Sequence, residues 1–87
     1  MNRIDVCFTF LGSGQGSFYI VPSVYNTIMQ NGSGCHTCML DSGSHTLFFT
    51  LNTGAGGNVE VKDSSGVIKA TYKLAKGHNS NSIPFIV

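Results

Sequence analysis

The amino-acid sequence predicts an all-β protein: a small antiparallel β-sandwich, or a partly open barrel, of about 7–8 short strands. Three observations support this fold class. Apolar residues recur at every second position, glycine-rich turns separate the apolar runs, and no segment has the period of a helix. Side chains alternate between the two faces of a strand, so a period of two builds one apolar face. A chain of 87 residues has room for one domain, 1–87.

The first strand, from Arg3 to Leu11, has the clearest pattern, with four apolar side chains on one face: Ile4, Val6, Phe8 and Phe10. It ends at the glycine-rich segment 12–16. The spacing of these glycines matches neither a dinucleotide-binding loop nor a P-loop, and no helix follows to bind phosphate. We therefore interpret the segment as a hairpin connection.

The middle of the chain predicts four more strands, at 17–21, 24–29, 35–40 and 44–51. A helix is conceivable at 24–29, but its β-branched residues and tyrosine favour a strand. The last of the four places His45, Leu47, Phe49 and Leu51 on one face. Phe48 lies on the opposite face, where it is either half exposed or covers a second core.

The final third predicts a strand at 58–62, a hairpin turn at 63–66 and a strand at 67–74. The polar segment 77–81 is expected to be a loop. A last strand at 83–87 is interrupted by Pro84, which has no amide hydrogen to donate.

The charge content is low, because charged residues make up 10% of the chain and the formal net charge is +1. Nucleic-acid binding needs clustered cations, so the dispersed Lys and Arg residues disfavour that function. Four of them, Lys62, Lys69, Lys73 and Lys76, are predicted to protect one edge of a sheet from aggregation.

No apolar stretch approaches the length of about 20 residues that a membrane span needs. The first residues also lack the basic and apolar regions of a signal peptide. We therefore expect a cytoplasmic protein, or one found in a virion or host cell if a phage encodes it.

Three cysteines, Cys7, Cys35 and Cys38, form an odd set without a secretion signal, which predicts reduced thiols. The segment Cys35-His36-Thr37-Cys38 holds the candidate metal ligands Cys35, His36 and Cys38. A structural zinc needs four ligands, and no second close pair is present. Positions three apart in a strand also point to opposite faces. We therefore expect packed thiols, no metal and no cofactor, with a metal site or thiol enzyme as the alternative.

Other catalytic arrangements are also weak. Serine, histidine and aspartate are available, but no strand-turn-helix nucleophile elbow is present. The few carboxylates lie in turns or on outward strand positions, which disfavours a glycosidase pair. The sequence therefore predicts a protein that is not an enzyme.

Three tyrosines are the remaining candidates for a contact surface, since an exposed aromatic ring binds a sugar or a protein at low entropic cost. Tyr72 shares a face with Ile68 and Leu74 and is expected to be buried. Tyr19 and Tyr25 are the predicted binding residues.

The ten residues from Leu40 to Phe49 (Leu-Asp-Ser-Gly-Ser-His-Thr-Leu-Phe-Phe) resemble the hairpin of PEGA-type β-sandwich domains. The Pro-Glu-Gly-Ala signature is absent, and Asp41-Ser42-Gly43-Ser44 stands at the turn. The resemblance implies a small β-sandwich of bacterial surface or envelope proteins that binds or spaces other parts without catalysis.

Together these observations predict a non-enzymatic protein-interaction or assembly module that works through an exposed sheet face or edge. A protein partner or self-association is expected, and carbohydrate is a further option. A small phage or mobile-element protein that inhibits a host defence protein is the alternative.

Overall fold

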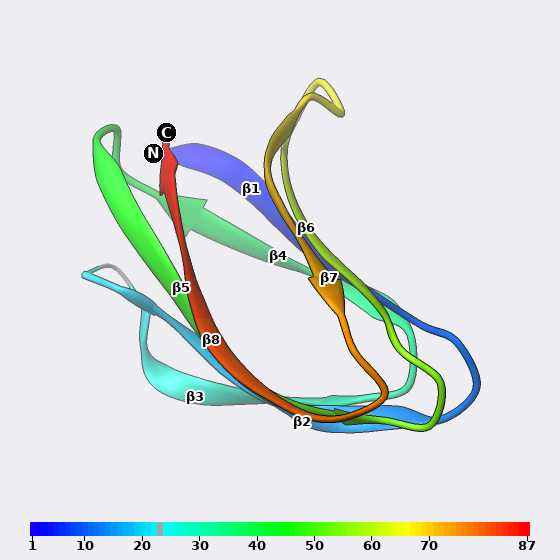
Figure 1. Ribbon diagram of the computed structural model, residues 1–87. Helices are drawn as coiled ribbons and strands as arrows, with labels where there is room; N and C mark the ends of the chain where they lie inside the picture. Colours follow the sequence, from blue (N-terminus) through cyan, green and yellow to red (C-terminus); the bar gives the residue numbers. More distant parts are fainter. Residues whose placement is uncertain (23) are drawn as a thin grey trace.

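The computed structural model describes every residue except 23, and it describes residues 24 and 25 by their backbone alone. The described residues form eight strands and no helix, which confirms the all-β prediction. Figure 1 follows them along the chain. The strands are β1 (Asn2–Phe10), β2 (Gly14–Val21), β3 (Val24–Asn31), β4 (Gly34–Leu40), β5 (Ser44–Thr53), β6 (Gly57–Asp63), β7 (Ile68–Leu74) and β8 (Gly77–Ile86).

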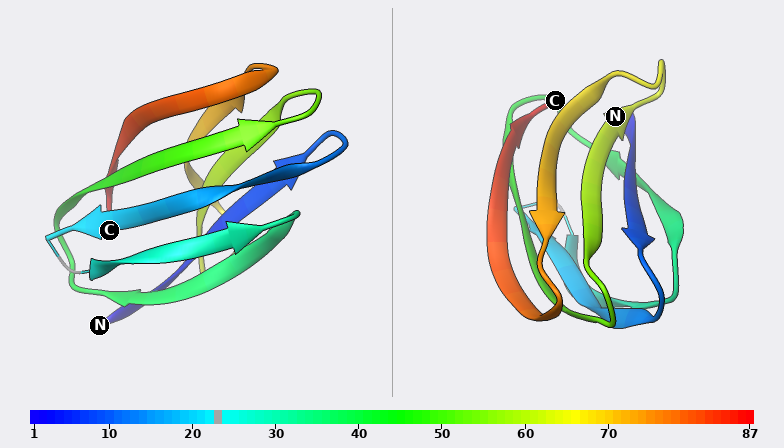
Figure 2. Two further views of the ribbon diagram at one scale, coloured as in Figure 1. Left: turned by 90° about the horizontal axis from the view of Figure 1, so that it is seen from below. Right: turned by 45° about the vertical axis from the view of Figure 1, so that its right-hand side comes forward.

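The strands pair into two antiparallel sheets that pack face to face. Over the described residues, sheet A has the strand order β4-β1-β6-β7 and sheet B the order β3-β2-β5-β8. Figure 2 shows the sheets as two layers that do not close into a barrel. The fold is therefore a sandwich.

Most connections cross from one sheet to the other. Among the described strands, β2–β3 and β6–β7 are the hairpins within a sheet. The predicted hairpin at 12–16 is therefore wrong, because residues 12 and 13 lie in the link from β1 in sheet A to β2 in sheet B, and residues 14–16 already belong to β2. A loop between sheets needs the same flexible residues as a hairpin, so the local sequence does not distinguish them. The link 41–43, within the PEGA-like segment, also crosses between the sheets.

The core lies between the two sheets and is built by the alternating positions that the sequence marks as apolar. β1 and β5 cross its centre, with β2 and β6 beside them. The innermost side chains are less than 2% exposed: Ile4, Val6, Phe8, Phe18, Ile20, Leu40, Leu47, Leu51, Val59 and Val61. Burial of an aliphatic or aromatic side chain contributes about 1.5–3 kcal/mol, so this row stabilises the sandwich.

β8 is longer than the sequence predicts. The expected loop at 77–81 is in fact its first half. β8 pairs with β5 along its whole length, from Thr53–Gly77 to Ser44–Ile86. Backbone hydrogen bonds hold this half, so it needs no apolar pattern. Pro84 is accommodated because β8 is an edge strand of sheet B.

The two halves of the chain are related by an internal two-fold pseudo-symmetry. A shift of four strands converts the order of sheet A into that of sheet B, read as β8-β5-β2-β3. The register agrees, since the pair Val6–Val61 corresponds to the pair Leu47–Ile20 at a shift of 41 residues. Each half therefore contributes two neighbouring strands to each sheet.

Candidate binding surface

Tyr19 lies where the sequence predicts, on the solvent face of sheet B. Its position on β2 follows from alternation, because its neighbours Phe18 and Ile20 point into the core. The Tyr19 side chain is 38% exposed. The other predicted binding residue, Tyr25, has its side chain outside the described part of the chain.

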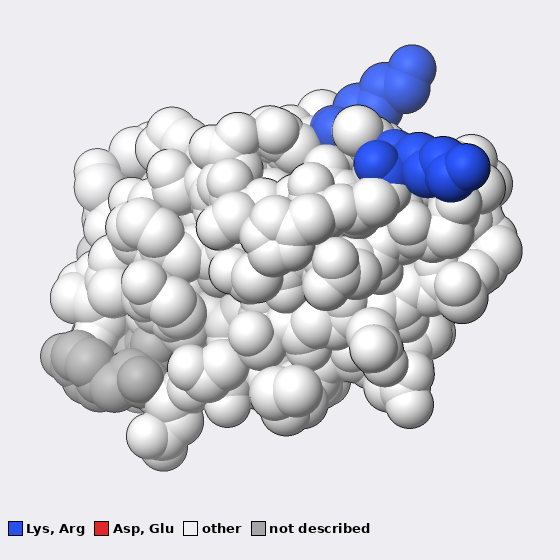
Figure 3. All heavy atoms as spheres, turned by 60° about the horizontal axis from the view of Figure 1, so that its bottom comes forward, with Lys and Arg blue, Asp and Glu red and all other residues white. Residues whose placement is uncertain are grey.

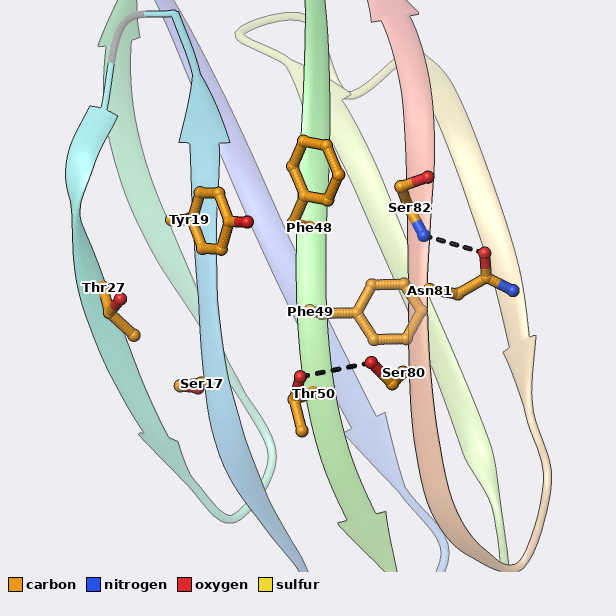
Figure 4. Close-up of a pocket in the computed structure, with 9 residues that line it drawn as sticks. All are labelled: Ser17, Tyr19, Thr27, Phe48, Phe49, Thr50, Ser80, Asn81 and Ser82. Atoms are coloured by element: carbon orange, nitrogen blue, oxygen red, sulfur yellow. Dashed lines mark hydrogen bonds between the residues drawn. The ribbon is translucent and has the colours of Figure 1, made fainter.

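Phe48 is the binding candidate that sequence reasoning did not assign. It lies directly opposite Tyr19 across the β2–β5 pair. The two ring centroids are 5.1 Å apart and the ring planes differ by 11°. Figure 4 shows Tyr19 and Phe48, the ring pair, side by side on neighbouring strands. The position of Phe48 between Thr46 and Thr50 was the available signal, because threonines mark that face as the outer one.

A shallow hollow of about 350 Å³ adjoins the ring pair. Ser17 lies opposite Thr50, and Thr50 lies opposite Ser80. These three small residues, the hydroxyl row, run across β2, β5 and β8 beside the rings (Figure 4). Thr50 and Ser80 are within 3.4 Å through their hydroxyl oxygens. The hollow is completed by Thr27, Phe49, Asn81 and Ser82.

Sheet B has no charged side chain in its described strands: none of β2, β3, β5 and β8 contains Asp, Glu, Lys or Arg. Acidic and basic residues lie instead in sheet A and in turns, as with the Arg3–Asp5 and Lys62–Glu60 pairs. Figure 3 shows the molecule from the side of sheet B, with basic side chains at one rim only. The outer face of sheet B is therefore polar and aromatic, and its described strands hold no Asp, Glu, Lys or Arg.

The pseudo-symmetry provides an internal comparison for this face. The position in sheet A that corresponds to the Tyr19–Phe48 pair is the Cys7–Glu60 pair. Neither residue there is aromatic. The fold therefore does not require two rings at this position.

The three candidate metal ligands are not brought together. Cys35 is exposed on the outer face of sheet A, whereas Cys38 is 7% exposed on the core face. This confirms that positions 35 and 38 point to opposite faces of the strand. Cys35 forms a disulfide with Cys7, its register partner on β1, with 4.0 Å between the Cα atoms. The prediction of three reduced thiols is therefore wrong, because strand pairing brings together two cysteines that are distant in sequence.

His36 and Cys38 have structural partners in the core. The His36 ring packs against Phe18, with 5.3 Å between centroids, and its Nε2 atom is hydrogen-bonded to the side-chain oxygen of Gln30. Burial raises the pKa of the Cys38 thiol above its ordinary value of 9.0, and the Asp5 charge adds to this effect. A thiol that stays protonated is a poor nucleophile and a poor metal ligand.

Tyr72, expected to be buried, packs against the core but is only partly buried, and its hydroxyl accepts a hydrogen bond of 2.8 Å from Asn81. The described residues include no group of three or more His, Cys, Asp or Glu side chains that could hold a metal ion. Among these residues there is also no helix long and apolar enough to cross a membrane.

Comparisons with known proteins yield no relative: no family model, no curated protein and no solved structure matches this chain.

Proposed function

We propose that this chain is a non-enzymatic binding module that works through the outer face of sheet B. The observation that carries the proposal is the ring pair on a sheet face without charged residues. Recognition surfaces are depleted of charge at their centre and enriched in aromatic residues, because an unpaired charge is costly to remove from water. The face fits that description, whereas the outer face of sheet A carries Arg3, Asp5, Glu60 and Lys62.

Two of the sheet edges, at β7 and β8, are poorly suited to bind another strand. β7, at one edge of sheet A, carries the exposed residues Lys69 and Lys73, which oppose pairing with another strand. β8, at an edge of sheet B, contains Pro84, which lacks an amide hydrogen. Strand addition at either edge is therefore disfavoured.

The non-enzymatic part of the proposal is supported by the state of the cysteine side chains. A thiol centre needs an exposed, low-pKa cysteine near a base. Cys35 is bound in a disulfide, and Cys38 is buried with a raised pKa. A phage-encoded inhibitor of a host protein would use the same uncharged face, so that alternative shares the binding surface proposed here.

Charge insertion tests the proposal. Phe48→Glu places a carboxylate in the ring pair, and Met39→Glu places one at a 53% exposed position on β4 of sheet A. Partners are captured from an extract of the source cell on immobilised protein, and self-association is measured by sedimentation. We expect Phe48→Glu to abolish whichever interaction the parent shows and Met39→Glu to preserve it. Equal retention by both variants would exclude this face as the binding site.

A further inference from the structure

The side chains around the ring pair indicate what kind of ligand fits the hollow. Apart from Tyr19, Phe48 and the core residue Phe49, its lining consists of residues with hydroxyl or amide side chains. Hydroxyls both donate and accept hydrogen bonds. A ligand that matches this lining has one flat apolar side and a rim of hydroxyl groups, which is the chemistry of a pyranose ring.

The absence of Asp, Glu, Lys and Arg among the described residues of sheet B restricts the class of ligand further. Carboxylate, phosphate or sulfate groups are normally bound by Arg or Lys, and none occurs in these strands. A charged sugar would lose its hydration without gaining an ionic partner. The face is therefore complementary to a neutral saccharide.

The shape of the surface suits a chain of sugars more than a second protein. The hydroxyl row of Ser17, Thr50 and Ser80 crosses three strands and adjoins the rings. Strands are spaced by about 4.8 Å, so the row extends over roughly 10 Å. A homodimer interface of stable size needs an apolar centre of greater extent. Here the rings of Tyr19 and Phe48 are flanked by hydroxyls on the adjoining row.

Two further observations agree with this assignment. The corresponding position of sheet A holds Cys7 and Glu60, so packing alone does not explain why rings occur on sheet B. The Cys7–Cys35 disulfide also persists best in oxidising surroundings, where polysaccharides of cell surfaces are accessible.

We infer that the ring pair and the hydroxyl row form a binding site for a neutral oligosaccharide. This inference rests on the proposed function. One sugar ring packs on Tyr19 and Phe48, and its hydroxyl groups exchange hydrogen bonds with Ser17, Thr50 and Ser80.

The probes are neutral gluco-, manno-, xylo- and chito-oligosaccharides, with oligogalacturonate as the acidic comparison. Binding is followed by amide chemical shifts and by calorimetry at low and high salt. We expect at least one neutral oligosaccharide to shift the amides of β2 and β5 around the ring pair. Its affinity should not change with salt, because no ionic contact is involved. Oligogalacturonate should not bind.

Variants locate the site. Tyr19→Ala removes one ring, and Phe48→Leu keeps apolar volume beside Tyr19 but removes the flat ring. Each should weaken saccharide binding by about tenfold or more, since aromatic anchors dominate such contacts. Met39→Ala, on sheet A, is the matched control and should bind as the parent does. Unfolding midpoints of all variants establish that each is folded.

The inference is overturned if no neutral saccharide shifts the amides, or if Tyr19→Ala and Phe48→Leu bind as tightly as the parent. If no neutral saccharide shifts the amides but Phe48→Glu still abolishes protein capture or self-association, the proposed function stands, because the face then binds a protein. If saccharide binding and capture both survive Phe48→Glu, the inference and the proposed function fail together.

Discussion

The backbone at Gly57 lies so close to β1 that no side chain fits between them. A Cβ atom built there would overlap the carbonyl oxygen of Thr9, and φ is +151°. The corresponding glycine of the other half, Gly16, meets the carbonyl oxygen of Thr50 in the same way. Thr9 and Thr50 are related by the same 41-residue shift as the core pairs. The close approach of β1 to β6, and of β2 to β5, therefore depends on one glycine in each half of the chain.

Gly57→Ala should destabilise the fold by about 3–5 kcal/mol, because the obstacle is backbone that cannot move without breaking the β1–β6 pairing. Gly32→Ala is the matched control: φ is +77° there, but no atom lies within 4 Å of the added Cβ. Its cost should be about 1–2 kcal/mol, from the left-handed conformation alone. Urea unfolding measures both. Equal losses would contradict the role of close approach at Gly57.

The ionisation of Asp5 links the stability of the fold to acidic pH. Thr37 Oγ1 donates a hydrogen bond of 2.9 Å to Asp5 Oδ1, and Arg3 Nε lies 3.3 Å from the same oxygen. These contacts, with the Thr37 hydrogen bond as the largest, hold the pKa of Asp5 below its ordinary value of 3.8. A lowered pKa in the folded state means that the unfolded state binds the proton more tightly. The stabilisation is present above pH 3.8 and is lost as the pH falls through the lowered pKa.

Thr37→Val should raise the pKa of Asp5 toward 3.8 and reduce this acid-dependent loss of stability. Carboxyl chemical shifts give the pKa, and denaturant midpoints at several acidic pH values give the stability. Thr50→Val, on sheet B and remote from Asp5, should leave the titration unchanged. An unaltered Asp5 titration in Thr37→Val would show that the hydroxyl is not its main partner.

At the scale of elements, sheet edges are protected in different ways. β7 carries Lys69 and Lys73, as the lysine pattern predicts for an edge strand, while Lys62 lies on β6 and Lys76 follows β7. β4, the other edge of sheet A, is joined to β1 by the Cys7–Cys35 disulfide. This covalent link fastens β4, an edge strand with a short apolar pattern, to its neighbour β1.

Reduction of the disulfide should lower the free energy of unfolding by about 2–4 kcal/mol, the usual effect of releasing a cross-link, here between residues 28 apart. The measurement is the denaturant midpoint with and without reductant. The variant Cys7→Ala/Cys35→Ala should be insensitive to reductant. A parent protein whose midpoint does not respond would contradict a stabilising disulfide in the native state.

At the scale of the whole molecule, the pseudo-symmetry relates the two halves of the chain, whereas the distribution of charged residues distinguishes the two sheets. Each half of the chain supplies two strands to each sheet, yet charged strand residues occur in sheet A, within the described chain. The halves are therefore alike in backbone and core, and the sheets differ in their outer faces. Both chain ends lie at the same end of the molecule, where Met1 and Val87 line one shallow hollow (Figure 1).

The pseudo-symmetry predicts that the order of the halves can be exchanged. A permutant with the old ends joined by a short glycine-serine linker and new ends between Asp41 and Ser42 should fold to the same sandwich, because this turn is exposed. Amide spectra compared with the parent test this outcome. A permutant opened between Phe48 and Phe49 interrupts the central strand β5 and should not fold. Failure of the first permutant would mean that folding requires β1–β4 before β5–β8.

The candidate site was only partly predictable. Tyr19 was accessible to sequence reasoning, because Phe18 and Ile20 beside it mark the core face. For Phe48 the sequence permits two interpretations, half exposed or covering a second core, since alternation gives its face but not the residue beside it. The Cys7–Cys35 bond is not predictable from the sequence, because the two residues lie 28 positions apart and no local signal marks their pairing.

The sequence by itself determined the all-β class, most strands and the apolar side of each strand, because a period of two is a property of adjacent residues. The tertiary structure decided which strands are neighbours, and with them the disulfide, the Tyr19–Phe48 ring pair and the separation of charge between the sheets. These features join residues that are distant in the chain. Their register follows from packing of the whole core, which no short segment encodes.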